Sequence, residues 1–130
     1  MGCLNSFQKW FIGNYIREIL LDDGDVVGFV GHDIFPLVAP ENTEGDFIIY
    51  SRVHYQREKV KMGIYEDDAQ VELTIVSDIY DNALQIAAAV DNALTGEHEM
   101  HGQRFLIDLV DSSEEYYDNK YTEKIIYSIK

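Results

Sequence analysis

Four titratable side chains lie close together in residues 97–101, whose sequence is E-H-E-M-H. His98 and His101 could present two imidazoles to one metal ion, and Glu97 and Glu99 could add carboxylate ligands. The spacing differs from the H-E-x-x-H pattern of zinc enzymes. The segment also follows a predicted helix end, where a polar turn is common. We therefore expect a solvated turn here and no metal site.

Two other places offer groups for catalysis. His32 stands beside Asp33 and could form an acid–base pair, but no nucleophile is tied to it and adjacent side chains often point apart. Cys3 has no histidine in its sequence neighbourhood. The glycines at positions 24, 28 and 31 match neither the dinucleotide-binding pattern nor the phosphate-binding loop. We expect no catalytic residues and no cofactor, so the chain is not predicted to be an enzyme.

Pairs of neighbouring acids raise the question of calcium binding. Three such pairs occur in the sequence: Asp22-Asp23, Asp67-Asp68 and Glu114-Glu115. None follows the alternating acidic pattern that ends in glycine in calcium-binding loops. We expect these acids to be solvated surface groups.

The basic residues are unevenly distributed along the chain. The 130 residues contain 10 Lys+Arg and 24 Asp+Glu, which gives a formal net charge of −14. Four of the basic residues fall within ten positions, namely Arg52, Arg57, Lys59 and Lys61. A basic loop and an acidic remainder are complementary between copies, which would orient a head-to-tail contact that can close into a ring. These four residues are our candidate subunit interface; the alternative is an ordinary solvated loop.

Composition excludes several classes of protein. A single Cys cannot form an internal disulfide or a Cys-based zinc site. A hydrophobic content of 46% is too high for a disordered acidic tail. No apolar run approaches the roughly 20 residues of a membrane span, and we see no signal peptide, so we expect no membrane association. The strong negative charge disfavours specific or general nucleic-acid binding.

The first six residues, M-G-C-L-N-S, match the myristoylation pattern, with Cys3 as a second acylation site. Apolar residues typical of a helix follow directly, and the only nearby basic residue is Lys9. Stable anchoring needs a second signal such as a polybasic patch. We favour an unmodified N-terminus, and whether Met1-Gly2 is native stays open.

Hydrophobic periodicity predicts two helices and four main strands. One helix begins at Asn5 or Ser6 and ends near residues 22–24, and the other begins at Ser77 or Asp78 and ends at Thr95-Gly96. Alternation predicts strands over residues 47–56, 68–76, 105–111 and 121–129, the last two forming a hairpin. Residues 57–67 are predicted to be a projecting loop or a flared hairpin tip, and residues 112–120 a polar connection. Residues 26–31 could be a short strand or an extended connection, and residues 34–40, with both prolines, an edge strand or loop.

This order of elements predicts an α+β fold in a single domain, residues 1–130. We expect a mainly antiparallel sheet of about four strands, with an N-terminal helix and a second helix packed on one face. The many alanines of the second helix allow its close approach to the sheet.

Several segments resemble the tail-completion or tail-terminator family of long-tailed phages and prophages. They are D-I-F-P-L-V-A-P at residues 33–40, F-I-I-Y at residues 47–50 with the charged loop after it, and V-E-L-T-I-V-S at residues 71–77. The pattern continues through Tyr80-Asp81-Asn82-Ala83 to Gly96, so the resemblance spans nearly the whole chain.

The resemblance implies a structural virion protein that forms a ring, usually a hexamer, at the head-proximal end of the tail tube. Such a ring ends tube polymerisation and joins tail to head. The implied partners are other copies of the chain, the tail tube protein and the head–tail connector protein. The implied location is the virion tail, with the host cytoplasm before assembly. DNA would pass through the ring, and an acidic lumen would repel it.

A second class of function also fits the composition. A small acidic α+β protein could be an inhibitor or DNA mimic that occupies a basic groove on a partner. Self-assembly would favour the ring, whereas tight binding to a basic partner without self-assembly would favour the inhibitor. An enzyme ranks third, because no set of residues supplies a nucleophile, a base and an orienting group.

Overall fold

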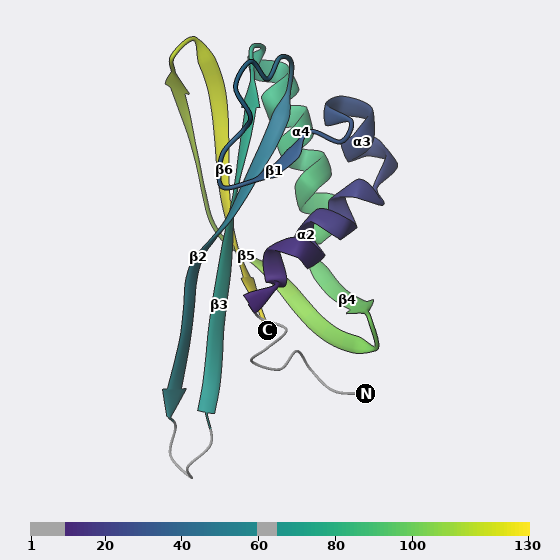
Figure 1. Cartoon of the computed structure of the whole chain (residues 1–130), viewed down its shortest axis with the longest axis vertical. Coiled ribbons are helices and arrows are strands. Elements are labelled where there is room, and N and C mark those ends of the chain that lie inside the picture. Colours follow the sequence, from purple (N-terminus) through teal and green to yellow (C-terminus); the bar gives the residue numbers. More distant parts are fainter. Residues whose placement is uncertain (1–9, 60–64) are drawn as a thin grey trace.

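The computed structural model describes residues 10–59 and 65–130, with side chains described for residues 10–53 and 69–130. Its helices are α2 (Ile12–Leu21), α3 (Gly24–Val30) and α4 (Tyr80–Leu94). Its strands are β1 (Ile34–Pro36), β2 (Phe47–Lys59), β3 (Tyr65–Ser77), β4 (Gly96–Met100), β5 (Gln103–Tyr117) and β6 (Lys120–Ile129). Figure 1 shows the helices on one side of the sheet.

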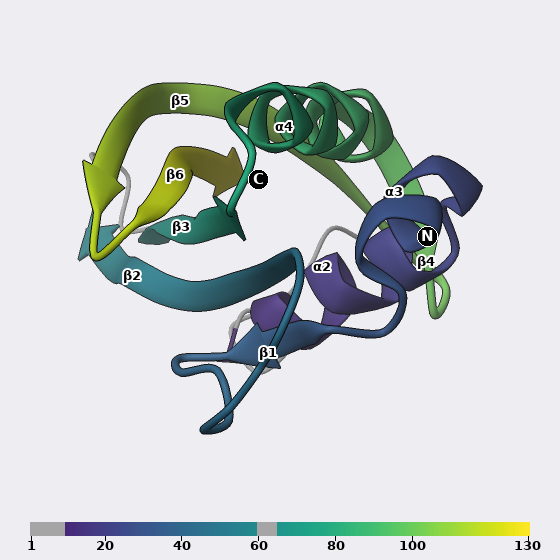
Figure 2. The ribbon, with the colours of Figure 1, turned by 90° about the horizontal axis from the view of Figure 1, so that it is seen from above.

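The sheet has the strand order β1-β2-β3-β6-β5-β4. All neighbouring strands are antiparallel except β1, which runs parallel to β2. Viewed from above, the sheet curls and the helices fill its open side (Figure 2). The prediction of about four antiparallel strands with two helices was wrong, because the described residues form six strands in a mixed sheet and three helices.

Two short elements account for most of this error. Residues 26–31, expected to be extended, lie mostly in α3, whose first turn is capped by Asp23: its carboxylate accepts hydrogen bonds from the backbone N–H groups of Asp25 and Val26. Burial of Val26 and Val30 compensates for the low helix propensity of valine. Residues 96–100, expected to be a turn, form β4 because they pair with β5.

The core lies between the concave face of the sheet and helices α2 and α4. As the periodicity predicts, α2 buries Ile12, Ile16 and Leu20, whereas Phe11, which the same periodicity places on this apolar stripe, is exposed. The buried stripe of α4 consists of Ala83, Ile86, Val90 and Leu94. The helical spacing of apolar residues also places Ile79 on this stripe, but Ile79 is exposed at the N-cap position. The N-cap prediction of Ser77 or Asp78 was therefore wrong by one or two residues.

Two hairpins extend beyond the helices at opposite ends of the sheet (Figure 1). Residues 57–67 were predicted to be a projecting loop or a flared hairpin tip; β2 continues to Lys59 and β3 begins at Tyr65, so the loop alternative was wrong for the ends of this segment. Residues 112–120 were predicted to be a polar connection, but β5 continues to Tyr117. The ends of these strands carry polar side chains, so their sequence does not alternate between apolar and polar residues. The strands therefore extend further than the apolar alternation predicts. The predicted hairpin of the last two strands is confirmed.

The turn between β5 and β6 consists of Asp118 and Asn119, both with positive φ. Two-residue hairpin loops of this kind favour glycine, because a side chain makes positive φ costly. We expect Asn119→Gly to raise the free energy of unfolding by about 0.5 kcal/mol, and Asn119→Ala to lower it by about 1 kcal/mol. Urea denaturation at constant m-value measures both changes. A glycine variant less stable than the parent would contradict this account.

Candidate assembly surfaces

The two histidines of the predicted E-H-E-M-H cluster have separate partners. The His98 ring nitrogen Nε2 hydrogen-bonds to the carbonyl oxygen of Leu94 at 2.6 Å, which ties β4 to the end of α4. His101 Nε2 lies 3.0 Å from the carboxylate of Glu18 on α2. Among the side chains that the structure describes, at residues 10–53 and 69–130, no group of three or more metal-ligating side chains comes together. This arrangement assigns structural roles to both histidines.

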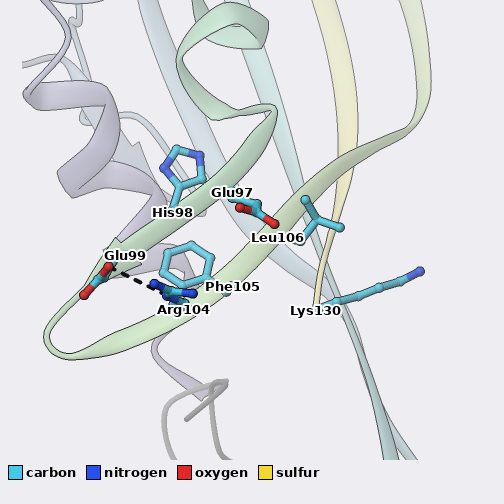
Figure 3. A pocket seen from close by; sticks show the side chains of 7 residues that line it. All are labelled: Glu97, His98, Glu99, Arg104, Phe105, Leu106 and Lys130. Carbon is cyan, nitrogen blue, oxygen red and sulfur yellow. Dashed lines mark ion pairs between the residues drawn. The ribbon is translucent and has the colours of Figure 1, made fainter. Parts of the chain in front are cut away.

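A hollow of about 420 Å³ lies beside the same strands (Figure 3). Its lining consists of Glu97, His98, Glu99, Arg104, Phe105, Leu106 and Lys130. Glu99 and Arg104 form an exposed ion pair at 3.8 Å, and the Lys130 side chain extends away from this pair in Figure 3. The charged groups therefore do not converge on one point where a substrate could react.

The other predicted reactive groups are dispersed. In the described part of the chain, His32 and Asp33 make no side-chain hydrogen bond or ion pair with each other. Asp23 acts as the helix cap of α3, which explains one of the acid pairs. Cys3 and the myristoylation pattern lie outside the described residues, and so do the side chains of Asp67 and Asp68.

The candidate interface residues divide between the base and the far end of the β2–β3 hairpin. The Arg52 guanidinium carbon lies 4.2 Å from the centre of the Trp10 ring, a cation–π contact. Arg57 and Lys59 occupy backbone positions on β2 opposite Asp67 and Tyr65 of β3. Lys61 lies outside the described residues. A subunit contact through these four residues stays a prediction.

The strand pairing shows how the charged residues of this hairpin are divided between its two strands. Arg57 and Lys59 lie on β2, whereas the neighbouring strand β3 carries Glu66, Asp67 and Asp68. Residues 52–68 contain four basic and four acidic residues, so the hairpin as a whole is neutral. Its positive charge is concentrated on β2, the outer strand of the hairpin.

Exposed apolar residues gather beside the edge strand β1. Trp10, Phe11, Leu37 and Val38 are all exposed, and Leu37 has a positive φ of 65°. Trp10, Phe11 and Leu37 help to line a hollow of about 380 Å³ that also includes residues 50–52 of β2. Contiguous exposed apolar groups are typical of protein contact surfaces.

A second surface lies at the opposite end of the sheet, where acids and tyrosines cluster between the β5–β6 hairpin and the start of α4. Glu114 on β5 pairs across strands with Glu123 on β6. The Tyr80 hydroxyl donates to the Glu114 carboxylate, with distances of 3.1 and 3.0 Å to its two oxygens. Tyr121 stacks at an angle between Tyr80 and Tyr116, with ring centres 5.4 and 4.8 Å away.

The surroundings of Glu123 and Tyr80 in this cluster raise the pKa of both groups. Partial burial, followed by the hydrogen bond and negative charge of Glu114, raises the pKa of Glu123 to about 7. The hydrogen bond to Glu114 also raises the pKa of Tyr80. The sequence does not reveal this cluster, because residues 112–120 are polar and are predicted to lie outside the strands. The only signal was the pair of acids at Glu114 and Glu115 followed by two tyrosines.

The fold has a counterpart among solved structures. It matches a chain of the structure described as the virion of a native gene transfer agent particle. The match has a TM-score of 0.71 and covers 88% of this chain and 89% of that chain, with 15% sequence identity. The two chains therefore share a fold over nearly their whole lengths. No protein-family model and no curated protein matches the chain.

The three helices of the described residues were compared with the length and hydropathy that a membrane-spanning helix needs. None of them is both long enough and apolar enough to cross a bilayer.

Proposed function

We propose that this chain is a structural protein of a virion tail. Several copies, six in the arrangement that the sequence resemblance implies, form a ring at the head-proximal end of the tail tube. The ring ends tube polymerisation and presents a surface to the head–tail connector protein. The chain has no catalytic role in this proposal, and it would reside in the host cytoplasm before assembly.

The observation that carries the proposal is the fold shared with a chain of a gene transfer agent virion. The described surface agrees with it, because hairpins at opposite ends of the sheet and an exposed apolar patch provide contact surfaces.

The proposal predicts that the chain caps tail tubes. We expect purified tail tube protein from the same genome to form shorter tubes when this chain is added, with one extra ring at one end in negative-stain electron micrographs. The matched control is heat-unfolded chain at the same concentration. Tubes of unchanged length without an end ring would contradict the proposal.

The formal net charge of −14 favours a second candidate function, an acidic inhibitor or DNA mimic that binds a basic partner. Light scattering across a concentration series separates the two. A ring-sized mass favours the tail protein. A strict monomer that leaves tube length unchanged favours the inhibitor.

A further inference from the structure

The two outer strands of the sheet are only partly covered by their neighbours. β1 pairs with β2 only at Ile48, Ile49 and Tyr50, so residues 51–59 of β2 have no strand on their outer side. β4 pairs with β5 only as far as Ile107, so residues 108–117 of β5 are uncovered as well. Among the strands formed by the described residues, none pairs with either stretch on its outer side. We call these stretches the β2 edge (residues 51–59) and the β5 edge (residues 108–117).

Long uncovered edges carry unpaired backbone N–H and C=O groups and readily accept another strand. The two edges are similar in length, as strand pairing between them would require. Each also exposes apolar side chains, which a partner strand would partly cover. These side chains are Val53 on the β2 edge and Leu109, Val110, Tyr116 and Tyr117 on the β5 edge.

The edges carry opposite charge. The β2 edge contains Arg52, Arg57 and Lys59 against one acid, Glu58. The β5 edge contains no basic residue and four acids, which are Asp108, Asp111, Glu114 and Glu115. Pairing of unlike edges is therefore attractive, whereas two β5 edges would repel each other.

The positions of the edges decide the type of contact. They lie on opposite sides of the sheet in the strand order, and their hairpins extend toward opposite ends of the molecule (Figure 1). One copy therefore offers one edge of each kind to two different neighbours, which is a head-to-tail contact. The two edges lie at different heights along the strand direction. When tilted strands close into a ring, neighbouring strands are offset along their length, and this offset brings the two edges to the same height.

We propose that the β2 edge of one copy pairs with the β5 edge of the next copy, so that the sheet continues through the assembly. The pairing is antiparallel, because β2 and β5 run in opposite directions in the sheet. It rests on the proposed function, since the ring is the assembly that it builds.

Amide hydrogen exchange tests for the new backbone hydrogen bonds. We expect amides in residues 51–59 and 108–117 to exchange at least about tenfold more slowly in the assembled protein than in dilute monomer. Amides in the central strand β3 at residues 71–75 serve as the internal control and should change little. Unchanged exchange at both edges of an assembled protein would overturn the pairing.

Thiol cross-linking tests which edges meet. In a Cys3→Ser background, Val53→Cys and Ser113→Cys chains are treated with a flexible bismaleimide, singly and as a mixture. The pairing predicts covalent dimers only in the mixture. Dimers of Ser113→Cys with itself would show a two-fold contact and overturn the proposal, as would a mixture that assembles without cross-linking.

Charge reversal tests the electrostatic match. Reversing Asp111 and Glu115 to Lys should weaken assembly at least about tenfold, and adding Arg57→Glu and Lys59→Glu to the same chain should restore it. Glu41→Lys with Glu44→Lys changes the net charge equally, away from both edges, and should have little effect. Failure of the combined reversals to restore assembly would contradict the match.

The outcomes separate this inference from the proposed function. Tubes that are capped while both edges exchange as in the monomer would overturn the strand pairing and leave the capping role intact. Protected edges in a protein that leaves tubes uncapped would overturn the capping role and leave the pairing intact. Edges that exchange as in the monomer, both in solution at every concentration and in chain bound to tail tubes, would overturn the pairing.

Discussion

Replacing Tyr127 with alanine is expected to lower the free energy of unfolding by about 4 kcal/mol. Tyr127 is the largest of the fully buried side chains on the described strands and helices. Its ring fills the space between β6 and α4, and its hydroxyl donates a 2.9 Å hydrogen bond to the carboxylate of Asp91 on α4. Alanine would leave a large cavity and remove this link between sheet and helix.

The matched variant Tyr127→Phe separates packing from hydrogen bonding. It keeps the ring and removes only the hydroxyl, so we expect a loss of about 1 kcal/mol. Urea denaturation followed by circular dichroism measures both variants, with the midpoint shifting at constant m-value. Equal losses for alanine and phenylalanine would show that the hydrogen bond outweighs packing at this site.

The carboxyl pair of Glu114 and Glu123 predicts an unusual pH dependence of stability. The folded state raises the pKa of Glu123 from 4.5 to about 7, so between these values the folded chain binds more protons than the unfolded chain. Stability from this group is therefore full below pH 4.5 and is lost as the pH rises through 7. The full shift corresponds to about 3 kcal/mol, and partial exposure of Glu123 to water reduces the expected loss to about 1 kcal/mol.

The variant Glu123→Gln isolates this effect, since it stays neutral at every pH. We expect it to match the parent near pH 5 and to exceed it by about 1 kcal/mol at pH 8. Glu115→Gln on the same hairpin is the control, because Glu115 makes only a long ion pair with Lys124, at 3.7 Å. Parallel pH profiles for the parent and Glu123→Gln would contradict the raised pKa.

Sequence periodicity was most informative where one face of an element is buried. The apolar stripes of α2 and α4 predicted the buried residues Ile16, Ile86 and Leu94. The alternation of Val71, Leu73 and Ile75 likewise predicted the buried face of β3. These positions face the core directly, so each of them requires an apolar side chain.

Periodicity failed where pairing or capping decides the structure. β4 alternates glutamates with His98 and Met100, so Met100 is its only apolar side chain, and it becomes a strand because β5 lies beside it. The outer half of β5 has no buried side chain, so its sequence lacks the apolar alternation that distinguishes a strand from a loop. The carboxyl pair depends on the register between β5 and β6, which no local pattern encodes.

The strand order also has a consequence for how the chain folds. The hairpins β2–β3 and β5–β6 join residues close in sequence, whereas the central pairing of β3 with β6 joins Ala69 to Ile129 and Ser77 to Tyr121. Contacts between distant residues form slowly, because a long loop must close first. The inner side of β3 therefore stays open during synthesis until β6 has been made, and this interval is when a newly made chain is most exposed to aggregation.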